Sequence, residues 1–192
     1  MNAKLHRNEH GITALETAII LIAFVVVAAI FAFTVLSTGT FLTEKSKEAA
    51  YAGLQEVRGS MELKGSVVIT GTAVNSNHKT IIFNLAPVAG GSSQDLSKVK
   101  ITYRDKNYNK ELTYNSGTTV SADNWIALDL EQSTATALTI LSAGKIAKIV
   151  VDPPTAITSY QTFALEIKPP TGGVLLLERT APAQIDTVTD LK

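Results

Sequence analysis

The chain has 192 residues, 45% of them apolar, and its 17 basic and 17 acidic residues balance to a net charge of zero. This length fits one domain of ordinary size with an appendage, and the balanced charge argues against a nucleic-acid partner, which needs a clustered basic surface. The chain has no cysteine, and two of its three histidines lie within the first ten residues. Disulfides and thiolate metal ligands are therefore excluded, and a His-based zinc site or catalytic triad is not expected.

A short polar leader comes first. Residues 1–11 contain Lys4 and Arg7 and end in Gly11, whereas a secretory signal has its cleavage site after the apolar segment. A cut between Gly11 and Ile12 would leave the apolar run in the mature protein and give Ile12 a free amine. The alternative is an uncleaved single-span anchor with a positively charged cytoplasmic flank.

A glutamate stands at the start of this apolar run. Between Glu16 and Glu44, 27 residues carry no Asp, Glu, Lys, Arg or His, which is longer than a bilayer needs. In the cut chain Glu16 would be the fifth residue. Its carboxylate is favoured by the helix dipole there, but an unpaired carboxylate in apolar surroundings costs on the order of several kcal/mol. The carboxylate could neutralise the ammonium group of its own chain or of a neighbour, and subunits stacked side by side would gain by pairing Glu16 of one copy with the Ile12 amine of the next. The simpler interpretation is a helix cap.

A single long helix is predicted from Ile12 to about Ser60. The segment from Thr17 to Val35 contains neither Pro nor Gly and is apolar on all sides, so lipid or protein must surround it. After a softer patch around Gly39, helical spacing resumes with charged residues available for a polar face. At 1.5 Å per residue this helix would be roughly 70 Å long, more than twice the thickness of a hydrocarbon core.

Beyond the helix the sequence changes to short runs typical of β-strands. In the run from Lys98 to Arg104, Val99, Ile101 and Tyr103 alternate with basic residues, which indicates a strand with one solvated face. Gly, Pro, Asn and Ser turns separate the runs, and this spacing predicts an antiparallel, immunoglobulin-like β-sandwich in an α+β chain. The strand candidates are Ser66–Thr70, Thr80–Leu85, Lys98–Arg104, Lys110–Tyr114, Trp125–Leu130, Lys145–Val151, Phe163–Lys168 and Val174–Arg179. The last pair looks like a hairpin, and residues 135–141 could form a ninth strand or a short helix.

No catalytic constellation is visible in this second part. Asp123, Asp129, Glu131 and Asp152 could in principle meet around a calcium ion, but they lack the D-x-D-x-D spacing. Exposed carboxylates at strand ends are the commoner arrangement, so no metal and no cofactor are expected. Trp125 is expected in the core.

Several segments together resemble the archaeal flagellins, or archaellins. They are the leader ending in Gly11, the glutamate at position 16, the runs LETAIILIAFVVVAAIFAF and FLTEKSKEAAYAGLQEV, and the tail LLLERTAPAQIDTVTDL. The resemblance covers about 65 residues at the two ends of the chain. Gly11 and Glu16 are features of all type IV pilin-like proteins, whereas the tail favours an archaellin.

The resemblance implies a function. Residues 1–11 would be a leader removed by a prepilin-type peptidase, 12–60 a membrane anchor that becomes the filament core, and 61–192 an outer β-sandwich domain. An ATP-driven machine would move the subunit from the cell membrane into an extracellular filament of identical copies, with or without sister flagellins, and that filament would rotate as a propeller. Processing would depend on Gly11 and Ile12, and assembly on Ile12 and Glu16. The polypeptide itself would catalyse nothing.

Two alternatives belong to other functional classes. An archaeal adhesion pilin would share the leader and the helix, and purified filaments would then attach to surfaces in a ligand-dependent way. A membrane-tethered β-sandwich binding protein would keep its helix in lipid, and it would sediment as a small particle after mild detergent extraction.

Overall fold

The computed structural model describes residues 10–71, 80–132 and 135–191, with side chains from Thr13 onward. Within it the chain divides into two compact units, of which the first ends at Tyr51 and the second begins at Ala52. The described residues of the first unit are all helical. The second contains the end of the same helix and all the described strands.

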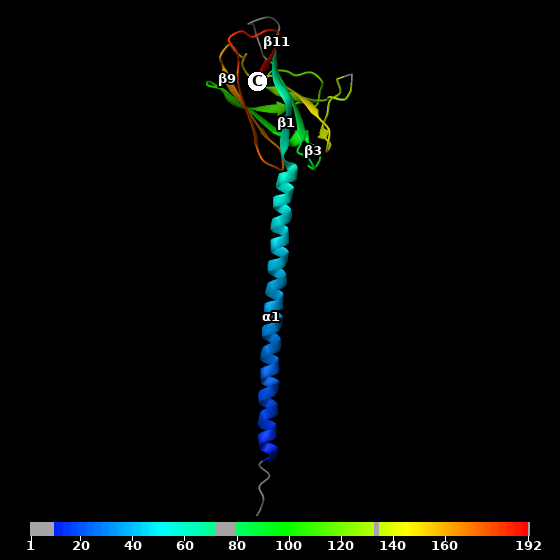
Figure 1. Ribbon diagram of the computed structural model, residues 1–192, viewed down its shortest axis with the longest axis vertical. Helices are drawn as coiled ribbons and strands as arrows, with labels where there is room; N and C mark the ends of the chain where they lie inside the picture. The colour runs from blue at the N-terminus through cyan, green and yellow to red at the C-terminus, as the bar shows by residue number, and fades with distance from the viewer. Residues whose placement is uncertain (1–9, 72–79, 133–134, 192) are drawn as a thin grey trace, which may run out of the picture. The chain divides into compact units, whose positions relative to one another are not determined.

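One helix, α1, runs from His10 to Gly59 without interruption over 50 residues (Figure 1). It contains no proline, and the chain continues as a helix through Gly39. The side chains from 13 to 58 are all exposed in the isolated chain. The long apolar helix that the sequence predicts is therefore confirmed.

The second unit is built on a nine-stranded sheet with the order β10-β9-β4-β5-β6-β8-β2-β1-β11. The short strands β3 and β7 form a separate two-stranded sheet. A 3-10 helix at Leu96–Lys98 directly follows β3. The strands are β1 (Met61–Thr70), β2 (Thr80–Pro87), β3 (Gln94–Asp95), β4 (Lys100–Arg104), β5 (Asn109–Tyr114), β6 (Asn124–Asp129), β7 (Ile140–Leu141), β8 (Ala147–Val151), β9 (Thr162–Lys168), β10 (Leu175–Thr180) and β11 (Val188–Leu191).

The large sheet has two antiparallel halves joined by a short parallel contact. One half is β10-β9-β4-β5 and the other is β6-β8-β2-β1-β11. At the join, β5 pairs in parallel with β6 through Thr113 opposite Asn124 and Tyr114 opposite Trp125. The expectation of an antiparallel arrangement thus holds in each half and is wrong at this join.

The main hydrophobic core takes side chains from both halves, which gives the domain its sandwich-like character. A smaller cluster is formed by Ile126, Leu128 and Val150. Tyr103 stacks on Phe163 within one half, with ring centroids 6.2 Å apart. Across the join, the rings of Tyr114 and Trp125 lie 4.9 Å apart. Trp125 is 1% exposed, which confirms its expected place in the core.

The eight predicted strand segments all contain a strand, although β1 begins five residues earlier than predicted and several other ends shift by one or two residues. The alternation around Ile101 is confirmed, since Val99, Ile101 and Tyr103 are buried while Lys98, Lys100 and Arg104 are exposed. The strands β9 and β10 form the predicted hairpin. Residues 135–141 contribute the short strand β7 and a bridge from Ala137 to Leu128. The strands β3 and β11 were not predicted.

Two strands form the edges of the large sheet. The edge strand β10 has six residues and carries Glu178 and Arg179, and the edge strand β11 has four residues and carries Asp190. In Figure 1 β11 lies beside β1. Both edges are thus short and carry charged side chains, which limits pairing with a foreign strand.

Candidate functional site

The residues proposed for processing and assembly lie at the start of α1. Gly11 and Ile12 both have helical backbone and lie one and two residues after His10, the first described position. Ile12 is joined to Gly11 here, so the amine assigned to it arises only if the chain is cut between them. Glu16 lies one turn further along, and its side chain is exposed. The structure therefore places these residues on one helical segment.

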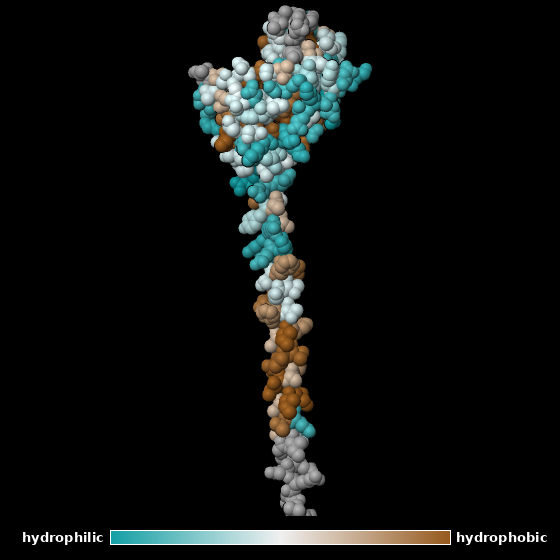
Figure 2. Space-filling view, turned by 180° about the vertical axis from the view of Figure 1, so that it is seen from behind, coloured by the Kyte–Doolittle hydropathy of each residue, from teal (hydrophilic) through white to brown (hydrophobic). Residues whose placement is uncertain are grey.

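The dominant feature of α1 is its exposed apolar surface. Large aliphatic and aromatic side chains project on all sides, for example Ile20 (67% exposed), Phe24 (73%) and Phe33 (72%). Figure 2 shows this surface as a continuous brown stretch of the helix. By length and composition α1 could cross a membrane. Soluble monomers rarely expose so much contiguous apolar surface, so either lipid or other protein must cover it.

Threonine hydroxyl groups within this surface donate to the backbone of the helix itself. Five threonines donate to backbone carbonyls three or four residues earlier, and four of these bonds have O···O distances of 2.8–2.9 Å. Such local bonds allow hydroxyls in surroundings without water. The donors are Thr17, Thr34, Thr38, Thr40 and Thr43.

Gly39 lies among these threonines and leaves a shallow groove on the helix surface. Val35, Leu36, Thr40, Thr43 and Glu44 also line it. A Cβ on Gly39 would meet nothing within 4 Å, so the space above it is open.

Charged side chains reappear on the helix at the C-terminal end of this groove. Glu44 is the first charged side chain after Glu16, and Lys45 pairs with Glu48 at 2.6 Å between Nζ and Oε2. Figure 2 shows teal side chains in this part of α1. The helix therefore has a long apolar part suited to lipid or to protein neighbours and a shorter polar part suited to water.

The four carboxylates considered for calcium do not gather in one place. Asp123 and Asp152 flank the Trp125–Val151 end of the β6–β8 pair, while Asp129 and Glu131 lie at the other end, opposite Ala147. Within the described residues, no group of three or more His, Cys, Asp or Glu side chains could hold a metal.

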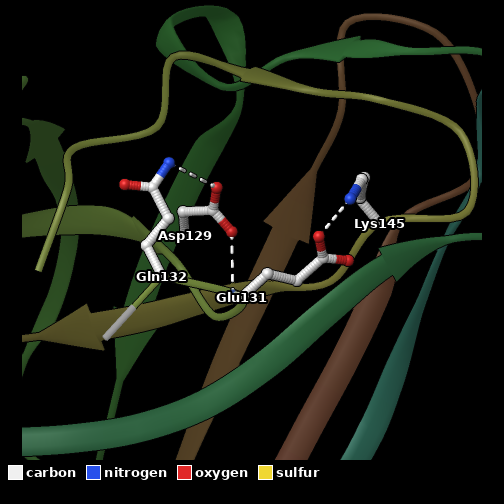
Figure 3. Close-up of polar contacts among 4 residues, drawn as sticks. All are labelled: Asp129, Glu131, Gln132 and Lys145. Carbon is white, nitrogen blue, oxygen red and sulfur yellow. Dashed lines mark hydrogen bonds and ion pairs between the residues drawn. The ribbon is translucent and has the colours of Figure 1, made fainter. Parts of the chain in front are cut away.

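At that second end the carboxylates have protein partners, as Figure 3 shows. Asp129 accepts from the backbone N–H of Glu131 at 3.0 Å and from the Gln132 amide at 3.4 Å. Glu131 pairs with Lys145, and this contact raises the pKa of the Lys145 ammonium. These carboxylates are thus engaged by neighbouring protein groups.

The basic residues around β4 also have carboxylate partners. Lys98 contacts Asp95 at 3.3 Å and Lys100 contacts Glu111 at 2.9 Å. The third, Arg104, lies 3.9 Å from Glu166. The cluster is therefore locally neutralised.

The carboxylate of Asp105 accepts several hydrogen bonds that the sequence did not predict. It accepts from the backbone N–H groups of Asn107 and Tyr108, both at 2.7 Å. It also accepts from the Tyr103 hydroxyl at 3.1 Å and the Gln161 amide at 3.1 Å. These bonds tie the β4–β5 turn to the loop before β9. The only sequence signal is an Asp at the start of a turn, which does not show the distant partners.

Comparison with known families and proteins gives consistent similarities. Residues 11–179 match the family model described as archaeal-type flagellin. The chain is 35% identical to probable flagellin 1 of Archaeoglobus fulgidus, with 98% of each chain covered. It is 30% identical to probable flagellin 1 of Aeropyrum pernix, with 94% of this chain and 96% of the relative covered.

Solved structures show the same similarity. The structure described as the archaeal flagellum of Methanospirillum hungatei aligns with a TM-score of 0.65 and 29% identity, covering 92% of this chain and 97% of the other. The crystal structure of the flagellin FlaB1 from Methanocaldococcus jannaschii aligns with a TM-score of 0.55 at 16% identity, over 68% of this chain and 95% of the other, which is a likeness of fold.

Proposed function

This chain belongs to the archaeal-type flagellin family, and on that premise we propose how it is processed, stored and assembled. It is a structural subunit of the archaeal flagellum filament, and members of this family are filament proteins and not enzymes. The similarity extends over nearly the whole chain. This favours a flagellum subunit over an adhesion pilin or a tethered binding protein.

We place the subunit in the cell membrane before assembly. A prepilin-type peptidase removes residues 1–11, and α1 from Ile12 onward stays in lipid. An ATP-driven machine then transfers the subunit into the extracellular filament, where copies of α1 form the core and residues 61–192 face outward. The observation that carries this proposal is the apolar surface of α1, which is exposed on all sides. A helix of this kind is as stable among copies of itself as in lipid, because both surroundings exclude water.

The cut creates the polar contact that directs assembly. The new ammonium group on Ile12 and the carboxylate of Glu16 have opposite charge, and both are costly to bury alone. In a stack of subunits, Glu16 of one copy pairs with Ile12 of the next. Repeating this head-to-tail contact without closure produces an open helical polymer.

Mass spectrometry of sheared surface filaments tests the processing step. We expect a subunit whose first residue is Ile12, and the same spectrum would reveal any added glycan mass. An intact Met1 in filament subunits would refute cleavage after Gly11. Recovery of the cut chain in membranes alone, with none in filaments, would refute the proposed assembly.

A further inference from the structure

We propose that the C-terminal end of α1 is a rigid joint, in which two loops of the sheet domain clamp Arg58, Gly59 and Ser60. The joint fixes the direction in which the last helical turn leaves the sheet. All the residues that form it belong to the second compact unit, which begins at Ala52. Its mechanical use rests on the proposed function, whereas its stiffness can be measured without a filament.

The first side of the clamp is the loop after β2, residues 88–92. The carbonyl of Arg58 accepts from the backbone N–H of Ser92 at 2.9 Å and from its hydroxyl at 3.4 Å. The Arg58 Nε donates to the carbonyl of Gly90 at 3.3 Å, and the Val88 N–H donates to the Ser60 carbonyl at 3.2 Å. Helices end with carbonyls that lack partners within the helix, and here the sheet domain supplies those partners.

The second side is the turn of the β9–β10 hairpin, residues 169–173. The Gly173 N–H donates to the Ser60 hydroxyl at 3.0 Å, and that hydroxyl donates to the Glu56 carbonyl at 3.2 Å. Ser60 thus links the hairpin turn to the last turn of the helix. This link joins residues 113 positions apart in the chain.

Glycines let the backbones of the clamp touch. A Cβ added to Gly59 would lie 2.4 Å from the Thr171 carbonyl oxygen, and one on Gly172 would lie 2.3 Å from the Gly59 carbonyl carbon. On the other side, a Cβ on Gly91 would lie 2.9 Å from the carbonyl oxygen of Arg58 in the last turn of the helix. These atoms are backbone atoms, which cannot move aside as the end of a flexible side chain can.

Burial also separates this joint from the rest of the helix. Gly59 is buried, whereas the side chains from 13 to 58 are exposed. Glycine usually adds flexibility to a chain. At Gly59 and Gly172 it has the opposite consequence, because the missing side chain permits close contact on two sides of the helix end.

Rigidity here has a use in a rotating filament. With α1 in the core and the sheet domain outside, any load between core and surface passes through the connection at Gly59 and Ser60. A flexible connection would let the sheet domains swing relative to the core. The clamp makes each sheet domain follow the end of its own helix.

Distance measurements between two spin labels test the joint directly. The chain has no cysteine, so L54C and T113C provide unique labelling sites on the exposed helix end and on β5 in the full-length, detergent-solubilised chain. We expect a narrow distance distribution in the parent chain. G59A and G172A should broaden it about twofold or more, because each forces the helix end and the hairpin turn apart.

Two matched glycine variants serve as controls. Gly53 lies in the same helix as Gly59, but a Cβ there would meet nothing within 4 Å. Gly144 shares a positive φ with Gly172 (79° and 113°) and also has open space around its Cβ position. G53A and G144A should therefore leave the distribution narrow. Equal widths in all four variants would overturn the proposal.

A milder variant covers the case in which G59A or G172A fails to fold. S60A removes one hydroxyl and its two hydrogen bonds without adding an atom, and the emission of Trp125, the single tryptophan, reports whether the core is intact. A broader distribution with unchanged emission supports the joint, and an unchanged distribution refutes it. If the parent chain never enters filaments, the proposed function fails, but the measured stiffness of the joint is unaffected.

Discussion

Tyr160 has a left-handed backbone conformation, with φ at 60°, although its side chain is 74% exposed. Bulky residues rarely adopt this conformation, because the Cβ approaches the following carbonyl oxygen. The backbone is held there by hydrogen bonds from the Tyr160 N–H to Ala181 and Pro182. The exposed ring gains little from burial in its own chain, so the residue is locally unfavourable.

Replacing Tyr160 by asparagine should therefore stabilise the chain. Asparagine tolerates the left-handed region better, and we expect the free energy of unfolding to rise by about 0.5–1 kcal/mol. Urea unfolding followed by Trp125 emission measures the change, and the m-value should stay constant. S159N, at the exposed neighbouring position, is the control and should have no effect. A loss of stability in Y160N would show that the ring has a stabilising contact in its own chain.

Tyr103 makes the stability of the sheet domain sensitive to alkaline pH. Burial, followed by the neighbouring Asp105 carboxylate, raises the pKa of the Tyr103 hydroxyl above its ordinary value of about 10. The folded chain therefore keeps this proton at a pH where the unfolded chain has lost it. The resulting stability is intact below pH of about 10 and is lost as the pH rises further.

Y103F should remove this part of the pH dependence. Between about pH 9 and 11, the free energy of unfolding should fall less steeply in the variant than in the parent chain, because phenylalanine has no proton to lose. Chemical unfolding at a series of pH values measures both slopes. Parallel slopes would contradict the assignment.

At the scale of single elements, the sequence predicted those helices and strands whose hydrophobic pattern extends over enough residues to be recognised. The apolar helix and strands such as β4 and β9 repeat their signal over five or more residues, and these were predicted. The strands β3 and β11 have two and four residues, which is too short for an alternation to stand out. Their pairing is decided by partners distant in sequence, as are the parallel join of β5 to β6 and the bonds of Asp105.

The residues proposed for processing and assembly were singled out for a similar reason, and their roles remain predictions. Gly11, Ile12 and Glu16 stand out because charge and glycine interrupt an otherwise uniform apolar stretch. The joint at Gly59 could not be predicted, because its contacts come from loops about 30 and 110 residues further along the chain. A lone glycine near a helix end is also a common capping residue, so it has little meaning by itself.

The apolar part of α1 should not tolerate a positive charge. V26K places an ammonium group within the stretch that lipid or other helices cover, at a cost of about 2.5–3.5 kcal/mol at the centre of a bilayer. We expect loss of the chain from the membrane fraction and from filaments, measured by fractionation and immunoblotting. V57K, next to Arg58 in the polar part, is the matched control. Normal membrane recovery of V26K would contradict a lipid-bound precursor.

At the scale of the whole molecule, the proposed pairing of Glu16 with Ile12 predicts a defect in assembly. E16Q leaves the cleavage site unchanged but removes the negative charge, and an ammonium group buried without its partner costs about 3–5 kcal/mol. In cells that lack other flagellins, we expect filament mass to fall at least about tenfold while the cut subunit accumulates in membranes. Electron microscopy and N-terminal mass spectrometry measure these two quantities.

E44Q provides the control for this experiment. Glu44 is the next charged residue along α1 and lies away from the proposed amine contact, so filaments should form in normal amounts. If E16Q polymerises as well as E44Q, the amine–carboxylate pairing is wrong, although the apolar helix could still drive assembly.

The short, charged edge strands of the large sheet limit strand pairing between neighbouring subunits that are packed close together. Along a filament, identical sheet domains are held at very high local concentration, which is the condition under which an open β-edge adds strands from its neighbours. Because β10 carries Glu178 and Arg179 and β11 has only four residues, we expect adjacent domains to remain separate bodies. Polymer growth would then be left to the proposed helix contacts, and the outer surface could vary in sequence without fusing one subunit to the next.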